Sequence, residues 1–127
     1  MPWMSLLVIA IGAVLGAWAR WGLGLLLNPT FPTLPLGTVA ANLIGAFIIG
    51  MMMALTGPFN ISPAARLLIT TGFLGALTTF STFSAETTTL LLRAQYAWAL
   101  AAAAVHLGGS LLMTGLGIVF VRIMFGR

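Results

Sequence analysis

The sequence lacks cysteine and lysine, and it contains one acidic residue, Glu86, and one histidine, His106, among its 127 residues. Without cysteine, a disulfide framework and thiolate chemistry are excluded. A single carboxylate cannot form the carboxylate pair of acid–base catalysis, and one acid with one histidine gives poor support to a metal site made of side chains. No serine–histidine–acid set and no glycine-rich phosphate loop is present either. The sequence therefore predicts that the protein is not an enzyme.

Apolar residues are what the sequence has in excess. Of its residues 61% are hydrophobic and 5% are charged, and the mean hydropathy is +1.15. A soluble domain of this size cannot cover so much apolar surface, because its surface-to-volume ratio is too high. A bilayer core about 30 Å thick takes about 20 helical residues per crossing, so the chain has room for roughly four crossings. We expect an all-α membrane protein with four transmembrane helices in one domain.

Five arginines supply the positive charge, at positions 20, 66, 93, 122 and 127. The sequence pI near 11.8 would suggest nucleic acid as the partner of a soluble protein. Because the arginines are scattered singly and form no basic stripe, no nucleic-acid partner is expected. In a membrane protein, basic residues instead mark helix ends and orientation.

Loops rich in proline and glycine divide the chain. NPTFPTLP at 28–35 and TGPFNISP at 56–63 are two of them, and Pro63 suits an early helical position. RAQY at 93–96 forms a short turn. Helices are expected at about residues 3–27, 37–55, 64–92 and 97–124.

The third apolar run is too long for one straight crossing. Its 64–92 range would span about 43 Å as a helix, which exceeds the hydrocarbon core. It also contains Gly72, Gly75 and the β-branched pair Thr78-Thr79. Two interpretations are open: a tilted helix with protruding ends, or a helix broken near residues 75–79. A break at that depth survives only where protein, water or an ion satisfies the freed backbone groups.

Polar residues recur on single faces of the last three helices, as expected at 100° per residue. The fourth helix carries one stripe, the second carries a pair one turn apart, and the third carries two polar faces. These sets are His106, Ser110 and Thr114; Thr38 and Asn42; Phe80, Phe83, Ser84 and Thr87; and Thr79, Thr82 and Glu86. For any one hydroxyl, hydrogen bonding to its own helix or helix packing is the ordinary explanation. Aligned sets on three helices favour a polar path.

His106 and Glu86 each allow more than one role. His106 could relay protons, bind a metal or act as a neutral hydrogen-bonding partner, and the lack of further ligands favours the last. Glu86 is costly if ionised in lipid, so it either faces protein or water near donors, or anchors a helix end at the interface.

The chemistry of the predicted path suits an anion. Hydroxyl and amide groups can donate hydrogen bonds to an anion, and the edge of a phenylalanine ring is electropositive. Conduction also needs sites that release the ion, which a cationic side chain at every step would prevent. Composition does not distinguish one anion from another.

Several segments together resemble the Fluc (CrcB-type) fluoride channels. The resemblance rests on GALTTFSTFS with Glu86 beyond it, GTVAANLIGAFIIG around Asn42, Arg20 late in the first helix, and HLGGSLLMTGLG in the fourth. It covers essentially the whole chain, and TTFSTFS is its most specific motif. The resemblance implies a passive, multi-pass channel of the bacterial inner membrane that exports fluoride and relieves fluoride toxicity.

The resemblance also implies an assembly and a set of site residues. Members form antiparallel homodimers in the lipid bilayer, with two pores lined by both subunits. The rings of Phe80 and Phe83 would contact fluoride and Asn42 would donate from the pore vestibule, with Ser84 on the same face as the rings. Further pore residues would be Thr38, Ser110 and His106, with Glu86 toward the end of the track. The backbone carbonyls of Gly75 and Thr78 would hold a structural sodium ion at the dimer interface.

Charge placement is compatible with dual topology. With a cytoplasmic amino terminus, three arginines (66, 122, 127) lie on one side and two (20, 93) on the other. So small a bias barely specifies a direction under the positive-inside rule.

Two other classes remain as alternatives. A small proton-coupled multidrug transporter also has four helices, but it needs a carboxylate deep in the membrane, typically in the first helix, where this chain has none. A membrane scaffold would explain the GxxxG spacing of Gly12 and Gly16 in the first helix, but not the aligned polar stripes.

Overall fold

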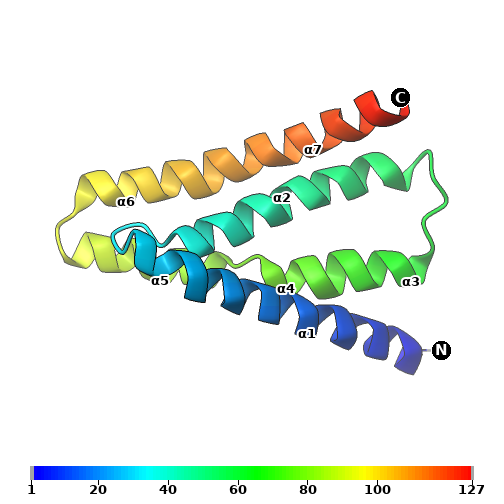
Figure 1. The fold of residues 1–127 in the computed structure, drawn as a ribbon, viewed down its shortest axis with the longest axis horizontal. Helices are drawn as coiled ribbons and strands as arrows, with labels where there is room; N and C mark the ends of the chain where they lie inside the picture. The colour runs from blue at the N-terminus through cyan, green and yellow to red at the C-terminus, as the bar shows by residue number, and fades with distance from the viewer. Residues whose placement is uncertain (1, 127) are drawn as a thin grey trace.

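Four helical spans run side by side in the computed structural model, which describes residues 2–126 (Figure 1). All four are long and apolar enough to cross a membrane. The first contains α1 (Pro2–Leu27) and the 3-10 turn η1 (Asn28–Thr30), and the second is α2 (Leu36–Thr56). The two ends of the chain lie at the same end of the molecule. Arg127 lies outside the described residues.

The third and fourth spans are each built from several pieces. The third contains α3 (Pro63–Arg66), the π-helical η2 (Leu67–Leu74), α4 (Gly75–Leu77) and α5 (Phe80–Leu92); the fourth contains α6 (Tyr96–Ala103), the π-helical η3 (Ala104–Gly109) and α7 (Ser110–Phe125). Pro63 is the first helical residue of its span, as predicted, and Ser62 caps it by accepting the Ala65 N–H at 3.1 Å.

The third span breaks near its middle. Thr78 (φ −82°, ψ 150°) and Thr79 (φ −149°, ψ 117°) are extended, so α4 ends at Leu77 and α5 begins at Phe80. Figure 1 shows the break as a gap in the helical ribbon between α4 and α5. The prediction of a broken helix near 75–79 is confirmed, and the straight tilted helix is wrong.

Glycines allow the spans to approach closely. A Cβ atom on Gly12 of α1 would collide with the Leu68 carbonyl oxygen, and one on Gly72 of η2 would collide with the Ile9 carbonyl oxygen. The backbones of these two spans therefore meet directly, as small residues permit in membrane helix pairs. On the other side, α2 and α7 meet in the same way at Gly50 and Gly117.

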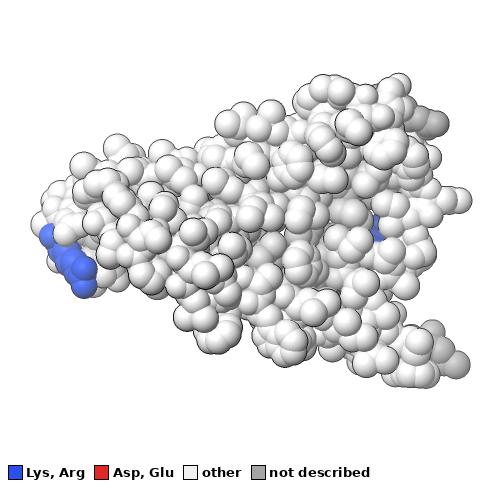
Figure 2. Space-filling model, in the orientation of Figure 1, with Lys and Arg blue, Asp and Glu red and all other residues white. Residues whose placement is uncertain are grey.

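The surface matches a chain surrounded by lipid. Large apolar side chains such as Leu6, Trp18, Leu100 and Ile123 are exposed. On the face drawn in Figure 2, arginine atoms show at the left end of the molecule and in a small spot set back from the right end, and the surface between them is uncharged. This pattern is typical of a protein whose middle lies in hydrocarbon and whose ends lie among headgroups.

Candidate functional site

Asn42 of α2 binds the backbone at the break. Its Oδ1 accepts the Thr79 N–H at 2.7 Å, and its Nδ2 donates to the Thr79 carbonyl at 3.0 Å. The Thr79 N–H would donate to the Gly75 carbonyl in a continuous helix, so the side chain replaces a backbone partner. This contact gives Asn42 a role in the fold that the helical pattern did not indicate.

Arg20 supplies a second contact to the break, from α1. Its Nε donates to the carbonyl of Ala76 at 3.0 Å, and the side chain is half-buried. A helix end inside a membrane leaves carbonyls without donors, and a guanidinium can satisfy one of them. Sequence reasoning assigned Arg20 to a helix end. The available signal was its position seven residues before the end of α1.

Thr79 begins the second half of the span as an N-cap. Its Oγ1 accepts the Thr82 N–H at 3.1 Å, and its hydroxyl donates to Thr82 Oγ1 at 3.1 Å. In a continuous helix the Thr82 N–H would donate to the Thr78 carbonyl. The carbonyls of Gly75 and Thr78 therefore both lose their usual donors, one to Asn42 and the other to Thr79.

Next to the break lies an open groove of about 470 Å³ between the second, third and fourth spans. Five predicted pore residues line it together with both predicted sodium-binding residues: Asn42, Phe80, Phe83, His106 and Ser110, with Gly75 and Thr78. Three polar lining residues were not predicted as site residues: Thr70, Thr79 and Thr114. Thr79 belongs to one of the polar faces recognised on the third helix. Thr114 belongs to the stripe recognised on the fourth helix, whereas Thr70 had no signal beyond its polarity.

The aromatic rings are arranged edge to face beside this groove. The Phe80 and Phe83 centroids are 5.5 Å apart with planes at 66°, and the Phe83 ring lies 4.7 Å from the His106 ring. Phe80 is 80% exposed, whereas His106 is 5% exposed. A ring so exposed beside a groove is free to present its electropositive edge to a ligand or to another chain.

The hydrogen bonds around Asn42 determine the tautomer of His106. Because Oδ1 accepts the Thr79 N–H, the other end of the amide must be Nδ2, which lies 3.0 Å from His106 Nδ1. Nδ2 can only donate, so Nδ1 accepts and the neutral ring carries its hydrogen on Nε2. That Nε2 atom is buried and has no hydrogen-bond partner among residues 2–126.

The groove hydroxyls divide into bound and available donors. The Thr78 hydroxyl donates to the Leu74 carbonyl at 2.8 Å, and the Thr114 hydroxyl donates to the Ser110 carbonyl at 3.0 Å. Within residues 2–126 the hydroxyls of Ser110 and Thr70 make no such bond. These two hydroxyls are the ones that can donate to an ion in the groove.

Thr38 and Glu86 lie apart from this groove. Thr38 lines a separate hollow of about 450 Å³ that also contains Arg20, Asn28, Thr79 and Thr82. The Thr38 hydroxyl donates to Glu86 Oε2 at 2.7 Å, so the carboxylate faces a protein donor. Thr79 lines both hollows. Ser84 is exposed and lines neither hollow.

Fold and site together define a small multi-pass membrane protein with a largely apolar groove beside a broken helix, in which a few hydrogen-bond donors and two phenylalanine rings lie together. The chain belongs to the CrcB-like family: the model described as "CrcB-like protein, Camphor Resistance (CrcB)" matches residues 7–118.

Relatives match almost the whole chain. A protein of Nitrosospira multiformis is 58% identical over 119 residues, covering 93% of each chain. One of Pseudomonas syringae pv. maculicola is 57% identical over 124 residues, covering 97% of this chain and 98% of its own. One of Nitrosomonas europaea is 53% identical over 120 residues, covering 94% of each. All three are named "Fluoride-specific ion channel FluC", and no enzymatic family is indicated.

Proposed function

We propose that this protein is a fluoride-selective passive ion channel. The observation that carries the proposal is the groove beside the break, where the Phe80 and Phe83 rings lie next to available donors in a chain whose relatives bear the name of such a channel. Fluoride is small and strongly hydrated, so it enters only a path whose donors replace its water. Ring edges and the Ser110 hydroxyl are donors of that kind.

The described residues that line the groove include no arginine, which favours conduction of an anion over its tight binding. Arg20 lies in the second hollow. Neutral donors bind an anion weakly enough to release it, whereas a guanidinium would hold it. Thr38 and Glu86, in contact with each other near that second hollow, would then serve the same path at another depth.

The working assembly in this proposal is an antiparallel homodimer with two pores. Support comes from the open side of the groove and from Phe80, which is 80% exposed beside it. A second chain would close the groove and bring a further wall. The arginine positions are also compatible with dual topology, because three (66, 122, 127) against two (20, 93) along the sequence barely specify a direction.

A structural sodium ion at the dimer interface belongs to the same proposal. Gly75 and Thr78 line the groove, and their carbonyls lack their usual helical donors, so these oxygens would suit a hard monovalent cation. Bound there, sodium would neutralise carbonyl dipoles that are costly to leave unpaired in a membrane. Removal of sodium should then reduce fluoride flux and the thermal stability of the dimer.

Flux from liposomes tests the channel directly. Purified protein should dissipate a fluoride gradient and leave a chloride gradient in place. Comparable chloride efflux would contradict selectivity, and drug uptake that depends on a proton gradient would support the multidrug transporter instead. Arginines added at one end, to force a single orientation, test the assembly: a variant of one orientation alone should be inactive, and co-expression with the variant of opposite orientation should restore flux.

The cellular role in this proposal is fluoride export across the bacterial inner membrane. A passive channel suffices, because fluoride accumulates in the cytoplasm when hydrogen fluoride enters and dissociates. A strain without other fluoride export should grow in fluoride only when it expresses the protein. Growth that is independent of expression would contradict this role.

A further inference from the structure

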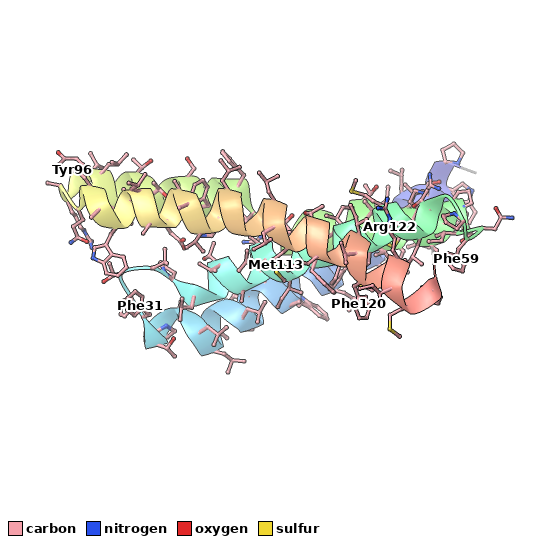
Figure 3. All side chains as sticks on the ribbon, turned by 90° about the horizontal axis from the view of Figure 1, so that it is seen from above. Phe31, Phe59, Tyr96, Met113, Phe120 and Arg122 are labelled. Atoms are coloured by element: carbon pink, nitrogen blue, oxygen red, sulfur yellow. The ribbon has the colours of Figure 1, made fainter. Side chains whose placement is uncertain are left out.

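A hollow of about 320 Å³ lies at the end of the molecule where α2 and α7 finish. Its walls come from the last turns of both helices and the turn that follows α2, and they include Met53, Gly57, Phe59, Val121, Arg122 and Phe125. Figure 3 shows Arg122 and Phe59 at this end, far from Tyr96 at the other. The hollow borders the last residues of two apolar spans, Leu36–Thr56 and Tyr96–Phe125. It therefore lies where hydrocarbon gives way to headgroups.

Arg122 has no acidic partner among residues 2–126. The only acidic side chain, Glu86, accepts a hydrogen bond from Thr38, near the start of α2, whereas the hollow adjoins the end of α2. Among residues 2–126 no ion pair involves Arg122. A counter-charge for its guanidinium must therefore come from outside the described chain.

Apolar side chains form one side of the hollow around Arg122. The rings of Phe59 and Phe125 meet edge to face, with centroids 5.1 Å apart, and Met53 and Val121 complete the apolar side. A ligand that gains from both the guanidinium and these walls must have an anionic head and an apolar stem. A small soluble anion would use the guanidinium alone.

We propose that this hollow binds the phosphodiester of an anionic phospholipid from the bilayer. The Arg122 guanidinium would donate to two phosphate oxygens, the geometry in which arginine binds phosphate best. The glycerol and the first acyl carbons would lie along Met53 and Val121, and the turn at Gly57 would leave room for the headgroup. This site is separate from the groove beside the break and does not depend on the channel function.

Arg66 provides a matched control. It is exposed at the same end of the molecule and lines neither the groove, nor the hollow at Thr38, nor the hollow at Arg122. Arg122 also lies in the last turn of α7, where a cation stabilises a helix without any ligand. The test must therefore separate lipid binding from helix stability.

Native mass spectrometry and thermal unfolding of the full chain in detergent make that separation. Three ligands are titrated separately: dioleoylphosphatidylglycerol, dioleoylphosphatidylcholine and inorganic phosphate. Each is added to four proteins, which are wild type, Arg122→Gln, Arg122→Lys and Arg66→Gln. We expect one phosphatidylglycerol per chain, an affinity lower by about tenfold or more in Arg122→Gln, and an intermediate loss in Arg122→Lys. Arg66→Gln should bind like wild type, and inorganic phosphate should neither compete nor stabilise.

Four results would overturn the proposal. Equal binding of the two lipids would exclude recognition of the anionic head. Equal losses in Arg66→Gln and Arg122→Gln would indicate general charge attraction. Competition by inorganic phosphate at the lipid's own concentration would identify a site for soluble anions. An unfolding temperature lowered in Arg122→Gln, with an unchanged stabilisation by phosphatidylglycerol, would leave Arg122 as a helix-end cation only.

Discussion

Asn42 holds the backbone of Thr79 by both ends of its amide, with Oδ1 accepting the N–H at 2.7 Å and Nδ2 donating to the carbonyl at 3.0 Å. The same Nδ2 donates to His106 Nδ1. One side chain of the second span thus provides hydrogen-bond partners for the backbone at the break in the third span, and it orients the histidine of the fourth span. The groove and the break are one hydrogen-bonded unit.

Asn42→Asp should disable this unit. The carboxylate can still accept the Thr79 N–H, but it has no donor for the Thr79 carbonyl or for His106, and it places a negative charge beside the groove. We expect fluoride flux to fall at least tenfold and stability to fall by about 1–3 kcal/mol. Asn60→Asp, in the exposed loop after α2, is the control. Wild-type flux and stability in Asn42→Asp would contradict the role of the amide.

Replacing Phe80 or Phe83 with isoleucine tests the ring edges. Isoleucine retains much of the apolar bulk but has no quadrupole, so flux should fall at least tenfold in each variant while the dimer still forms. Phe80 is 80% exposed in the single chain, so Phe80→Ile should barely change the stability of the monomer. Phe120→Ile removes a ring that pairs with Phe47 away from the groove, and it should retain flux. Undiminished flux in both groove variants would leave these rings as packing residues.

Arg20→Gln should destabilise the break. The Ala76 carbonyl loses its donor at 3.0 Å, and a buried acceptor without a partner costs about 1–3 kcal/mol. Thermal unfolding in detergent measures the loss, with Arg93→Gln at the exposed turn as the control. If the two variants unfold at the same temperature, the bond from Arg20 contributes nothing to stability.

The close approach of α1 and η2 predicts opposite effects for two glycines of the same helix. Gly12→Ala places a methyl group against the Leu68 carbonyl oxygen and should destabilise by about 1–3 kcal/mol. A Cβ atom on Gly22 meets nothing within 4 Å, so Gly22→Ala should be neutral or stabilise by up to about 1 kcal/mol. Unfolding measurements that give both variants the same sign would contradict the packing of these spans.

Ala94→Gly should stabilise the turn between the third and fourth spans. Ala94 has φ 58°, in the left-handed region, where it follows α5 in a Schellman motif closed by the Gln95 N–H to the Leu90 carbonyl at 2.8 Å. Glycine has no Cβ atom, so the steric cost of the left-handed conformation disappears and the free energy of unfolding should rise by about 1 kcal/mol. Ala97→Gly, inside α6, should lower the free energy of unfolding by about the same amount. A lower unfolding temperature for Ala94→Gly would contradict this geometry.

The sequence by itself determined the class of protein and the four spans, and it indicated where the third span could break. Lipid is the only solvent for so apolar a chain, and proline-rich loops end the spans. The excess length of the third run, with Gly72, Gly75 and the Thr78-Thr79 pair, indicated where the helix fails. These properties depend on local composition and on length along the chain, which a sequence records directly.

Only the tertiary structure decided which polar groups meet. Helical periodicity placed Ser84 with Phe80 and Phe83, but Ser84 is exposed outside both hollows. Thr38 and Asn42, one turn apart, serve different partners, Glu86 and Thr79. The position of Arg20 inside the first helix indicated a buried role, but only the packing of the spans identifies the Ala76 carbonyl as its partner. Helical periodicity tells which residues share a face of one helix. Which faces of different helices oppose one another depends on the close contacts at glycines, because these contacts set the depth and rotation at which the spans pack.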